Sequence, residues 1–368
     1  MNILYLTGCL SVGGTELYTL DYAQTIRRAG QTVFWATIRE GIFRETVEKS
    51  GIPLLYCELG KRSPIALMRA VRQLRRIVAE HNIDLIHATD AYSAMVAARA
   101  FKPKQKKHSL IWSNVGISSL SYLLMRKLCR NRIDGYIAVS HFIRNRMIEE
   151  GFDPQRITVY SQNRVTPEST KSREETRAEY GIGPEDFVIG SVGRLAPLKG
   201  NRTVLDALEP VVEKHPNVKL LLIGDGPERQ ALAQRAEELE LTKNVIFAGF
   251  CSDIENLYPA FDLVVFPTYY EALGYIPYEA MHHHRPIIAS RTGGVPELVI
   301  DGYNGLLVPP AMSKQWSDAI LQLIENPQQR DMLVKNGTAF YEQYLSRRNC
   351  EEKLLEVYTK LITSREER

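Results

Sequence analysis

Short apolar runs alternate with longer amphipathic segments along the whole chain, and the alternation restarts after residue 186. The runs have the length and the content of β-branched and aromatic residues that are typical of buried strands. The expected strands are residues 2–7, 32–37, 53–58, 84–88, 109–113 and 135–140 in a first series, and residues 187–193, 218–224, 244–250, 263–267, 286–290 and 305–309 in a second. This alternation predicts an α/β fold class with two doubly wound, Rossmann-like domains, each built on a parallel sheet.

Apolar residues at helical spacing fill the intervals between the strands of the first series. The expected helices are residues 15–28, 65–80, 92–100, 120–130 and 142–150. Residues 166–186 begin without a hydrophobic period, which predicts a linker followed by a short helix. We therefore expect an N-terminal domain over residues 1–165, a C-terminal domain over residues 166–345, and a last helix over residues 346–368 that returns to the first domain.

The composition of the 368 residues, 44% hydrophobic and 24% charged, is that of a globular protein. No apolar stretch approaches the roughly 20 residues of a membrane-spanning helix, and the first residues lack the basic start of a signal peptide. The five cysteines include no Cys-x-x-Cys spacing, which favours free thiols in a reducing compartment. We expect a cytoplasmic protein.

Charge is distributed unevenly along the chain. Residues 1–168 contain 24 Lys and Arg against 14 Asp and Glu, whereas the remainder contains 22 against 29. Residues 66–80 combine apolar residues at helical spacing with several arginines, a pattern of helices that lie on anionic membranes and also of ordinary surface helices. No pattern of aromatic residues for base stacking accompanies the charge, so nucleic acid is not an expected partner.

Two glutamates, Glu271 and Glu279, stand on either side of Gly274 between two of the expected strands. Gly274 permits a sharp turn, and Pro277 fits the first turn of a helix, whose free N–H groups can hold an anion. The two carboxylates could then bind hydroxyl groups beside that anion, and a phosphate between two diols describes a nucleotide sugar. Alternatively, Glu279 caps its own helix and Glu271 is solvated.

Residues suited to phosphate binding follow the first strand of each series. Gly13 and Gly14 could let the backbone approach a diphosphate, although many strand-to-helix turns carry glycine for packing. In the second series, Arg194 and Lys199 are spaced to converge on phosphate oxygens, unless their loop is merely solvated. The run GDGPER at 224–229 lacks the third glycine of a dinucleotide fingerprint, which disfavours a nicotinamide oxidoreductase.

Three consecutive histidines, His282, His283 and His284, are the main candidates for metal ligands. Consecutive residues of a helix point in different directions, so we expect a structural role for them. The sequence also lacks an Asp-x-Asp or similar paired-carboxylate motif. We therefore expect no metal and no other cofactor.

Taken in order, these motifs resemble those of the retaining GT-B glycosyltransferases of family 4, the glycosyl transferases group 1 family. The segments GRLAPLKG and EALGYIPYEAM are the most specific, with GGTE and GGVPELVIDGYNGLLV in support, and the resemblance covers almost the whole chain. It implies two Rossmann-like domains that face each other across a cleft. It also implies that the C-terminal domain binds most of the nucleotide-sugar donor and the N-terminal domain most of the acceptor.

The resemblance implies roles for individual residues. Arg194 and Lys199 would neutralise the departing diphosphate in place of a metal ion, and Glu271 would contact the hydroxyls of the transferred sugar. Glu279 would bind the ribose diol. The other donor contacts that it implies are Gly13, Gly14, Gly193, Gly274, Tyr275 and Ile276.

The sequence departs from the family pattern at two positions. Leu273 replaces an aromatic residue, and Asn114 falls near a histidine that relatives often carry. His87 ends an expected strand at a place where relatives also often have histidine. His87 and Asn114 are therefore candidates for the acceptor side, unless His87 is an ordinary strand-end residue.

The activity implied by the resemblance is metal-independent transfer of a sugar from a UDP- or GDP-sugar to a saccharide or lipid-linked acceptor, with retention of configuration. The basic first domain favours an acceptor met at the inner face of the cell membrane, by a peripheral enzyme of surface polysaccharide or glycolipid synthesis. The alternatives are a sugar-nucleotide epimerase or hydrolase of the same fold, and a catalytically silent subunit that binds nucleotide sugars.

Overall fold

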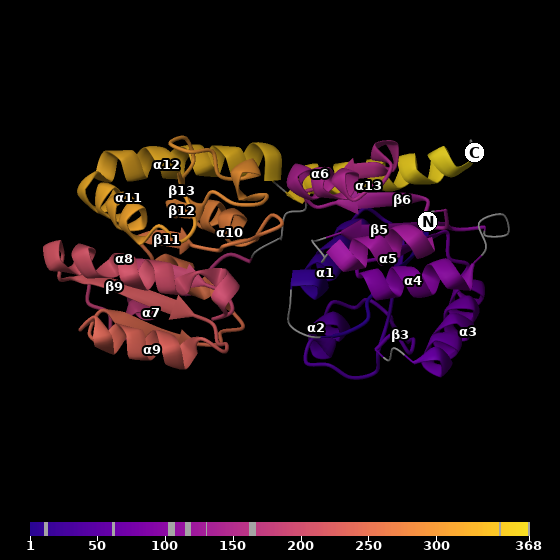
Figure 1. The fold of residues 1–368 in the computed structure, drawn as a ribbon, viewed down its shortest axis with the longest axis horizontal. Coiled ribbons are helices and arrows are strands. Elements are labelled where there is room, and N and C mark those ends of the chain that lie inside the picture. Colours follow the sequence, from indigo (N-terminus) through magenta and orange to yellow (C-terminus); the bar gives the residue numbers. More distant parts are fainter. Residues whose placement is uncertain are drawn as a thin grey trace. The chain divides into compact units, whose positions relative to one another are not determined.

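The computed structural model describes residues 1–10, 14–60, 63–101, 107–114, 119–129, 131–161, 167–345 and 347–366. The chain divides into two compact units. Met1–Asn163 together with Arg347–Arg368 form unit 1, and Arg164–Ser346 form unit 2. Each unit contains a parallel sheet covered by helices (Figure 1), which confirms the expected α/β class with two Rossmann-like domains.

Unit 1 contains a seven-stranded parallel sheet in the order β3-β2-β1-β4-β5-β6-β7. The strands are β1 (Asn2–Leu6), β2 (Thr32–Thr37), β3 (Leu54–Tyr56), β4 (Leu85–Ala88), β5 (Ser109–Asn114), β6 (Gly135–Ala138) and β7 (Ile157–Val159). The helices of residues 1–163 are α1 (Gly14–Arg28), α2 (Arg44–Lys49), α3 (Pro64–Glu80), α4 (Ala91–Ala100), α5 (Ser119–Cys129) and α6 (His141–Glu149). All strands and helices expected in this half are present, and α2 and β7 are additions.

Unit 2 contains a six-stranded parallel sheet in the order β10-β9-β8-β11-β12-β13. The strands are β8 (Phe187–Val192), β9 (Val218–Ile223), β10 (Val245–Gly249), β11 (Leu263–Phe266), β12 (Ile287–Ser290) and β13 (Leu306–Val308). The helices are α7 (Arg173–Glu179), α8 (Asn201–Lys214), α9 (Arg229–Glu238), α10 (Ile276–His282), α11 (Ser313–Glu325) and α12 (Pro327–Phe340). The central strands are buried on both faces, which explains their continuous apolar runs.

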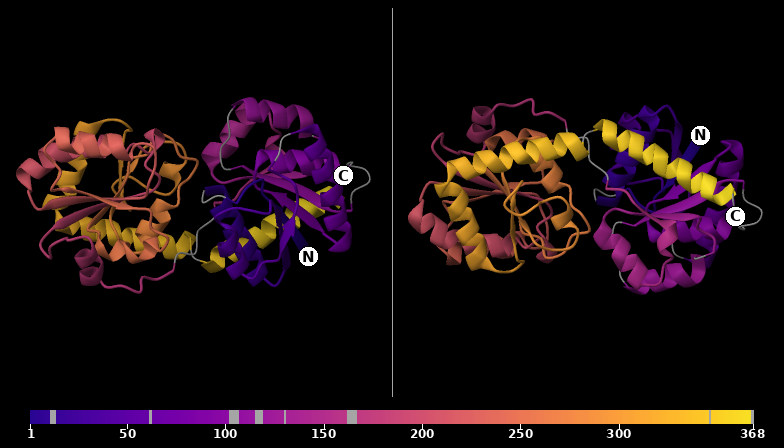
Figure 2. Two further views of the ribbon diagram at one scale, coloured as in Figure 1. Left: turned by 90° about the horizontal axis from the view of Figure 1, so that it is seen from below. Right: turned by 90° about the horizontal axis from the view of Figure 1, so that it is seen from above.

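The last helix, α13 (Arg347–Glu366), packs on the sheet of unit 1, as the sequence predicts (Figure 2). The hydroxyl of Tyr358 lies 2.8 Å from that of Tyr5 in β1. Leu361 fills the space beside Gly135, where a Cβ would lie 2.3 Å from Cδ2 of Leu361. The helix therefore completes the core of a unit whose other residues come from the start of the chain.

Candidate functional site

The strand order reverses at one point in each sheet, and ligands of doubly wound folds bind outside the carboxyl ends of the strands that flank this point. In unit 2 the flanking strands are β8 and β11. Arg194 and Lys199 lie in the β8 loop (residues 193–200), and Glu271 lies in the β11 loop (residues 267–275). The fold thus puts the three residues expected to be catalytic on the two loops where a ligand site is expected.

Lys199 and Glu271 meet directly. Nζ of Lys199 lies 2.7 Å from Oε2 of Glu271, and their side chains are 34% and 21% exposed. The ammonium group also lies 5.9 Å from the centre of the Phe266 ring, at the end of β11. An ion pair in this position is open to a ligand, while the partial exclusion of water strengthens its interaction with further charges.

Arg194 is exposed and follows Gly193, whose φ of 141° is a conformation that other residues rarely adopt. The neighbouring backbone is fixed, because the N–H of Leu195 donates to the carbonyl oxygen of Asp225 over 3.0 Å. Among the ion pairs that the described residues form, none involves Arg194. Its guanidinium group is therefore available to an anion.

The β11 loop is fastened to the β8 loop. The N–H of Tyr269 donates to the carbonyl oxygen of Leu198 over 2.8 Å. Gly200, at φ 66°, permits the close approach, because a Cβ there would lie 2.1 Å from the carbonyl oxygen of Pro267. The two loops therefore hold the Lys199–Glu271 pair as one assembly.

A third loop, after β12, contacts the backbone of Glu271. The N–H of Gly294 donates to the carbonyl oxygen of Glu271 over 3.0 Å. Gly293 has φ 54°, and a Cβ at this position would lie 1.9 Å from the same carbonyl oxygen. From the sequence these glycines look like turn residues, and no local pattern indicates that they contact the β11 loop.

Glu279 lies deeper than Glu271. Gly274 adopts φ 94° in the turn, as the sequence predicts, and Tyr275 is the N-cap of α10, which begins at Ile276. Oε2 of Glu279 accepts a hydrogen bond of 2.7 Å from the hydroxyl of Tyr258, and Glu279 is 1% exposed. Tyr258 belongs to no recognisable motif, so sequence reasoning could not assign this contact.

The glycine loop of unit 1 is described only in part. Gly13 lies outside the described residues. Gly14 is the first residue of α1, and a Cβ at its position would meet no atom within 4 Å. Contacts among the described residues therefore do not require glycine at this position.

For His87 the structure favours the alternative of an ordinary strand-end residue over a role on the acceptor side. This residue is fully buried on β4, where its Nδ1 lies 2.5 Å from the hydroxyl of Tyr358 and its Nε2 is hydrogen-bonded to Oγ of Ser113. Burial lowers the pKa of His87 to about 3. Because both ring nitrogens have partners inside unit 1, His87 joins α13 to the sheet. Asn114 ends β5, and the acceptor contact expected of its side chain lies outside what the structure describes.

Within the described parts of the chain, one group of side chains has the composition and spacing to hold a metal ion. It consists of Glu168, His282 and His283. The group lies at the C-terminal end of α10, whereas Gly274 and the β11 loop precede the N-terminal end of that helix. The candidate metal ligands thus do not belong to the Lys199–Glu271 pair.

Two Rossmann-like units, with cations and carboxylates at a strand-order reversal of the second, define a class of two-domain α/β proteins that bind phosphate-containing ligands. The family profile described as "Glycosyl transferases group 1" matches residues 172–340, and the one described as "Glycosyltransferase Family 4" matches residues 12–161. Together these matches span most of both units, so the chain belongs to the family 4, or group 1, glycosyltransferases of the GT-B fold.

The individual relatives have low sequence identity to this chain. The D-inositol 3-phosphate glycosyltransferase of Corynebacterium urealyticum is 32% identical over 235 residues, which cover 60% of this chain and 55% of that protein. The chain spans about half the length of the first curated relatives it matches. The putative glycosyltransferase EpsD of Bacillus subtilis is 24% identical, with 94% of this chain and 93% of EpsD covered.

Solved structures resemble the chain over nearly its full length. Anabaena Alr3699/HepE in complex with UDP and glucose is 25% identical, with a TM-score of 0.85 and with 98% of this chain and 99% of that chain covered. The sucrose-phosphate synthase of Thermosynechococcus elongatus, at 20% identity and a TM-score of 0.79, shares the fold over 99% of this chain and 100% of that chain.

Proposed function

We propose that this chain is a retaining glycosyltransferase that moves a sugar from a nucleotide-sugar donor to a saccharide or lipid-linked acceptor. The observation that carries the proposal is the Lys199–Glu271 ion pair at the strand-order reversal of unit 2, with Arg194 in the same β8 loop as Lys199. In this proposal unit 2 binds the donor and unit 1 binds the acceptor.

The two cations act on the departing diphosphate. Negative charge develops on the diphosphate oxygens as the bond to the sugar breaks, and positive charges already fixed in place lower the energy of that state. Arg194 can bind two oxygens at once through its planar group, whereas Lys199 acts as a point charge. Together they supply positive charge of the kind that a divalent ion supplies at metal-dependent phosphate sites.

Glu271 can change partners when the donor binds. In the structure its carboxylate pairs with Lys199. A diphosphate that takes over the ammonium group would leave this carboxylate free to accept hydrogen bonds from the hydroxyls of the transferred sugar.

Further donor contacts surround these charged residues in our proposal. Glu279, held by Tyr258, binds the ribose diol. The backbone positions of unit 2 proposed to line the sugar and the phosphates are Gly193, Gly274, Tyr275 and Ile276.

We propose a UDP-sugar as the donor, because Anabaena Alr3699/HepE, at 25% sequence identity, forms complexes with UDP and with UDP-glucose. Thermal denaturation of the chain with UDP-, GDP- and ADP-sugars tests this choice. The nucleotide that raises the unfolding temperature at the lowest concentration identifies the base.

Replacement of either cation tests the proposed activity. We expect Lys199→Ala and Arg194→Ala each to lower kcat roughly a hundredfold, since loss of one charge-stabilising donor commonly costs about 3 kcal/mol in the barrier. The measurement is UDP release from a UDP-sugar in the presence of a saccharide acceptor. Lys314→Ala is the control, because Lys314 is 86% exposed on α11 of the same unit. Near-normal turnover in both cation variants contradicts the proposal.

We also expect turnover to survive treatment with EDTA, because Arg194 and Lys199 supply the charge that neutralises the diphosphate. The measurement compares kcat before and after removal of divalent ions by dialysis against EDTA. A loss of kcat that only a divalent ion restores would show that the two cations are not sufficient.

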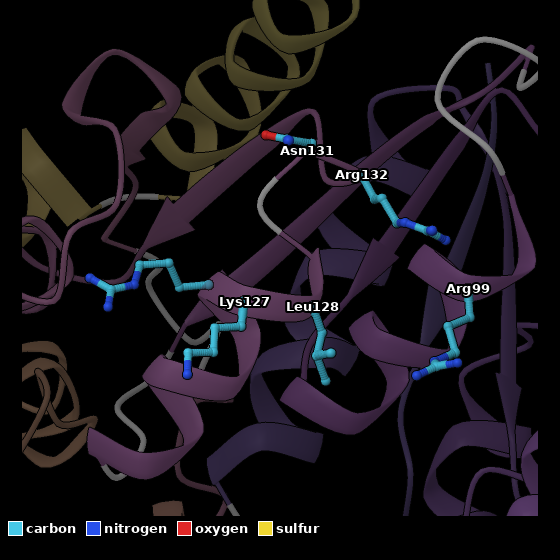
Figure 3. A pocket seen from close by; sticks show the side chains of 6 residues that line it. Arg99, Lys127, Leu128, Asn131 and Arg132 are labelled. Atoms are coloured by element: carbon cyan, nitrogen blue, oxygen red, sulfur yellow. The ribbon is translucent and has the colours of Figure 1, made fainter.

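We propose an acidic or lipid-linked acceptor because unit 1 presents cations beside exposed apolar residues. A cavity of about 440 Å³ is lined by Arg99, Arg126, Lys127, Leu128, Asn131 and Arg132, none of which is acidic. Figure 3 shows these side chains around the ends of α4 and α5. A second cavity, of about 420 Å³, borders α5 as well and is lined mainly by apolar side chains such as Leu67, Met95 and Leu124.

Cations next to an apolar cavity favour contact with an anionic membrane surface. Within the described residues, no helix combines the length and the apolar character needed to cross a membrane.

A further inference from the structure

Glu168, His282 and His283 bring three metal-binding side chains together in unit 2. One ligand atom from each side chain can be chosen such that all three lie within 4.8 Å of one another. Nε2 of His282 lies 3.5 Å from Oε1 of Glu168, and the centres of the two imidazole rings are 4.8 Å apart. Nitrogen and carboxylate ligands in this combination suit Zn²⁺ and related transition-metal ions more than Mg²⁺ or Ca²⁺.

The end of α10 explains why two consecutive histidines converge. Continued helical geometry would turn their side chains apart, but α10 ends at His282, and His283 is the C-cap with φ −86° and ψ 15°. His284 then adopts φ 55° and directs its Nδ1 to Oγ1 of Thr338, 2.8 Å away. The run of three histidines thus divides into a converging pair and a third residue with another partner.

The histidine pair also leaves buried polar atoms without hydrogen bonds. Nε2 of His282 and Nε2 of His283 are buried and have no hydrogen-bond partner among the described residues. His283 is 7% exposed, so water at the surface does not readily serve it. Buried polar atoms nearly always have hydrogen-bond partners. Two buried imidazole nitrogens without hydrogen bonds, one of them 3.5 Å from the Glu168 carboxylate, therefore point to a ligand between these side chains.

The surrounding structure holds the three side chains in place. The ring of His283 stacks on that of Tyr258, with centres 4.6 Å apart and planes at 12°. Soon after Glu168, the N–H of Thr170 donates to Oδ1 of Asn256 over 2.8 Å, which fixes the segment that carries the carboxylate. The side chain of Glu168 is 84% exposed and free to turn, so it can close the remaining distance to ligand positions about 2.0–2.2 Å from a Zn²⁺ ion.

We propose that Glu168, His282 and His283 form a binding site for a divalent transition-metal ion of the Zn²⁺ type, with water completing the coordination. The bound ion ties the segment that enters unit 2 to the C-terminal end of α10. The site does not depend on the proposed glycosyl transfer, because none of its ligands is assigned to the donor or to the departing diphosphate.

Equilibrium dialysis of the full chain against Zn²⁺, after removal of metals by EDTA and without donor or acceptor, tests the proposal. We expect about one Zn²⁺ per chain with a dissociation constant in the micromolar range or below, and a rise in unfolding temperature with Zn²⁺ concentration. Mg²⁺ at the same concentration should neither displace Zn²⁺ nor raise the unfolding temperature.

Three substitutions test whether Zn²⁺ binds to Glu168, His282 and His283. Glu168→Gln removes the charge at an exposed position, His282→Ala removes one imidazole, and His283→Phe keeps the ring that stacks on Tyr258 but removes its nitrogens. Each should weaken Zn²⁺ binding at least tenfold, whereas the matched control His284→Ala should not.

The results that overturn the proposal are absence of stoichiometric binding to the unaltered chain, or binding that Glu168→Gln and His282→Ala leave unchanged. The Glu168→Gln variant keeps the test decisive if His283→Phe does not fold, because Glu168 is an exposed side chain. Since no sugar nucleotide is present, failure of this test is distinct from failure of the proposed transferase activity.

Discussion

Lys199 and His87 show how the surroundings of a side chain determine which groups it can bind. The Lys199 ammonium is partly exposed and faces a carboxylate, so it can exchange one anion for another. The His87 ring is fully buried between two neutral hydroxyl groups, from Tyr358 and Ser113. These hydroxyls satisfy both ring nitrogens of a neutral imidazole and offer no negative charge to an imidazolium.

We expect unit 1 to lose stability as the pH falls from about 6.5 towards 3. Burial lowers the pKa of His87 to about 3 in the folded chain, whereas histidine in an unfolded chain has a pKa of about 6.5. Between these values the unfolded chain binds the additional proton, so the free energy of unfolding decreases as the pH decreases. The full contribution is present above pH 6.5, and at pH 5 the single site has lost about 2 kcal/mol.

Urea unfolding at pH 7 and pH 5 measures this effect. In a Trp316→Phe variant the fluorescence comes from Trp35 and Trp112, which both lie in unit 1, because the chain contains three tryptophans. A second variant that also carries His87→Gln should show a smaller decrease between the two pH values. Equal decreases in the two variants would assign the acid sensitivity to other groups.

At the scale of structural elements, the candidate donor site depends on loops that support one another. The β8 loop, the β11 loop and the loop after β12 touch through backbone atoms, and glycines stand where a side chain would separate them. Positions such as Gly293 therefore influence Glu271 through its backbone.

We expect Gly293→Ala to lower kcat by roughly a hundredfold, because the added Cβ must displace the backbone of Glu271, and a shift of about 1 Å at a reacting group has an effect of this size. Gly302→Ala is the matched control. Gly302 also has a positive φ, of 73°, but a Cβ there meets no atom within 4 Å. Both substitutions should cost about 1 kcal/mol of stability from the backbone conformation. Equal kcat values for the two variants would contradict the supporting role of Gly293.

The sequence predicts elements well where burial leaves a pattern. Parallel strands buried on both faces are continuous apolar runs, and the expected ones are present. The helix and the strand of residues 1–163 that were not expected, α2 and β7, are too short to show a period, and α2 buries only Val47.

Motifs predicted which residues lie at the strand ends but not what they touch. The partner of His87 stands 271 positions away in Tyr358, and no local pattern distinguishes a strand-end histidine that faces solvent from one covered by a returning helix.

At the scale of the whole molecule, the two parts of the chain differ in net charge, because residues 1–168 are basic and the remainder is acidic. The basic cavity of unit 1 and the apolar cavity beside it both border α5. An interaction of unit 1 with an anionic surface should therefore depend on charge and weaken with salt.

We expect the chain to float with vesicles that contain anionic lipid at low salt, and the double substitution Arg99→Glu with Lys127→Glu to abolish this binding. Both residues line the basic cavity, and each reversal replaces attraction by repulsion. Lys314→Glu makes a charge reversal on unit 2 and should leave flotation unchanged. If the unaltered chain does not bind anionic vesicles at low salt, a soluble acceptor is favoured over a membrane-bound one.

The assignment of α13 to unit 1 has a consequence for biosynthesis. A ribosome makes unit 2 completely before it reaches Arg347, so the part that comes second in the sequence can finish folding first. Until Tyr358 emerges, His87 and Tyr5 lack their hydroxyl partner, and the nascent unit 1 exposes an apolar surface to chaperones and proteases. A premature stop codon shortly before α13 would therefore yield a chain with an intact second half and an unfinished first half.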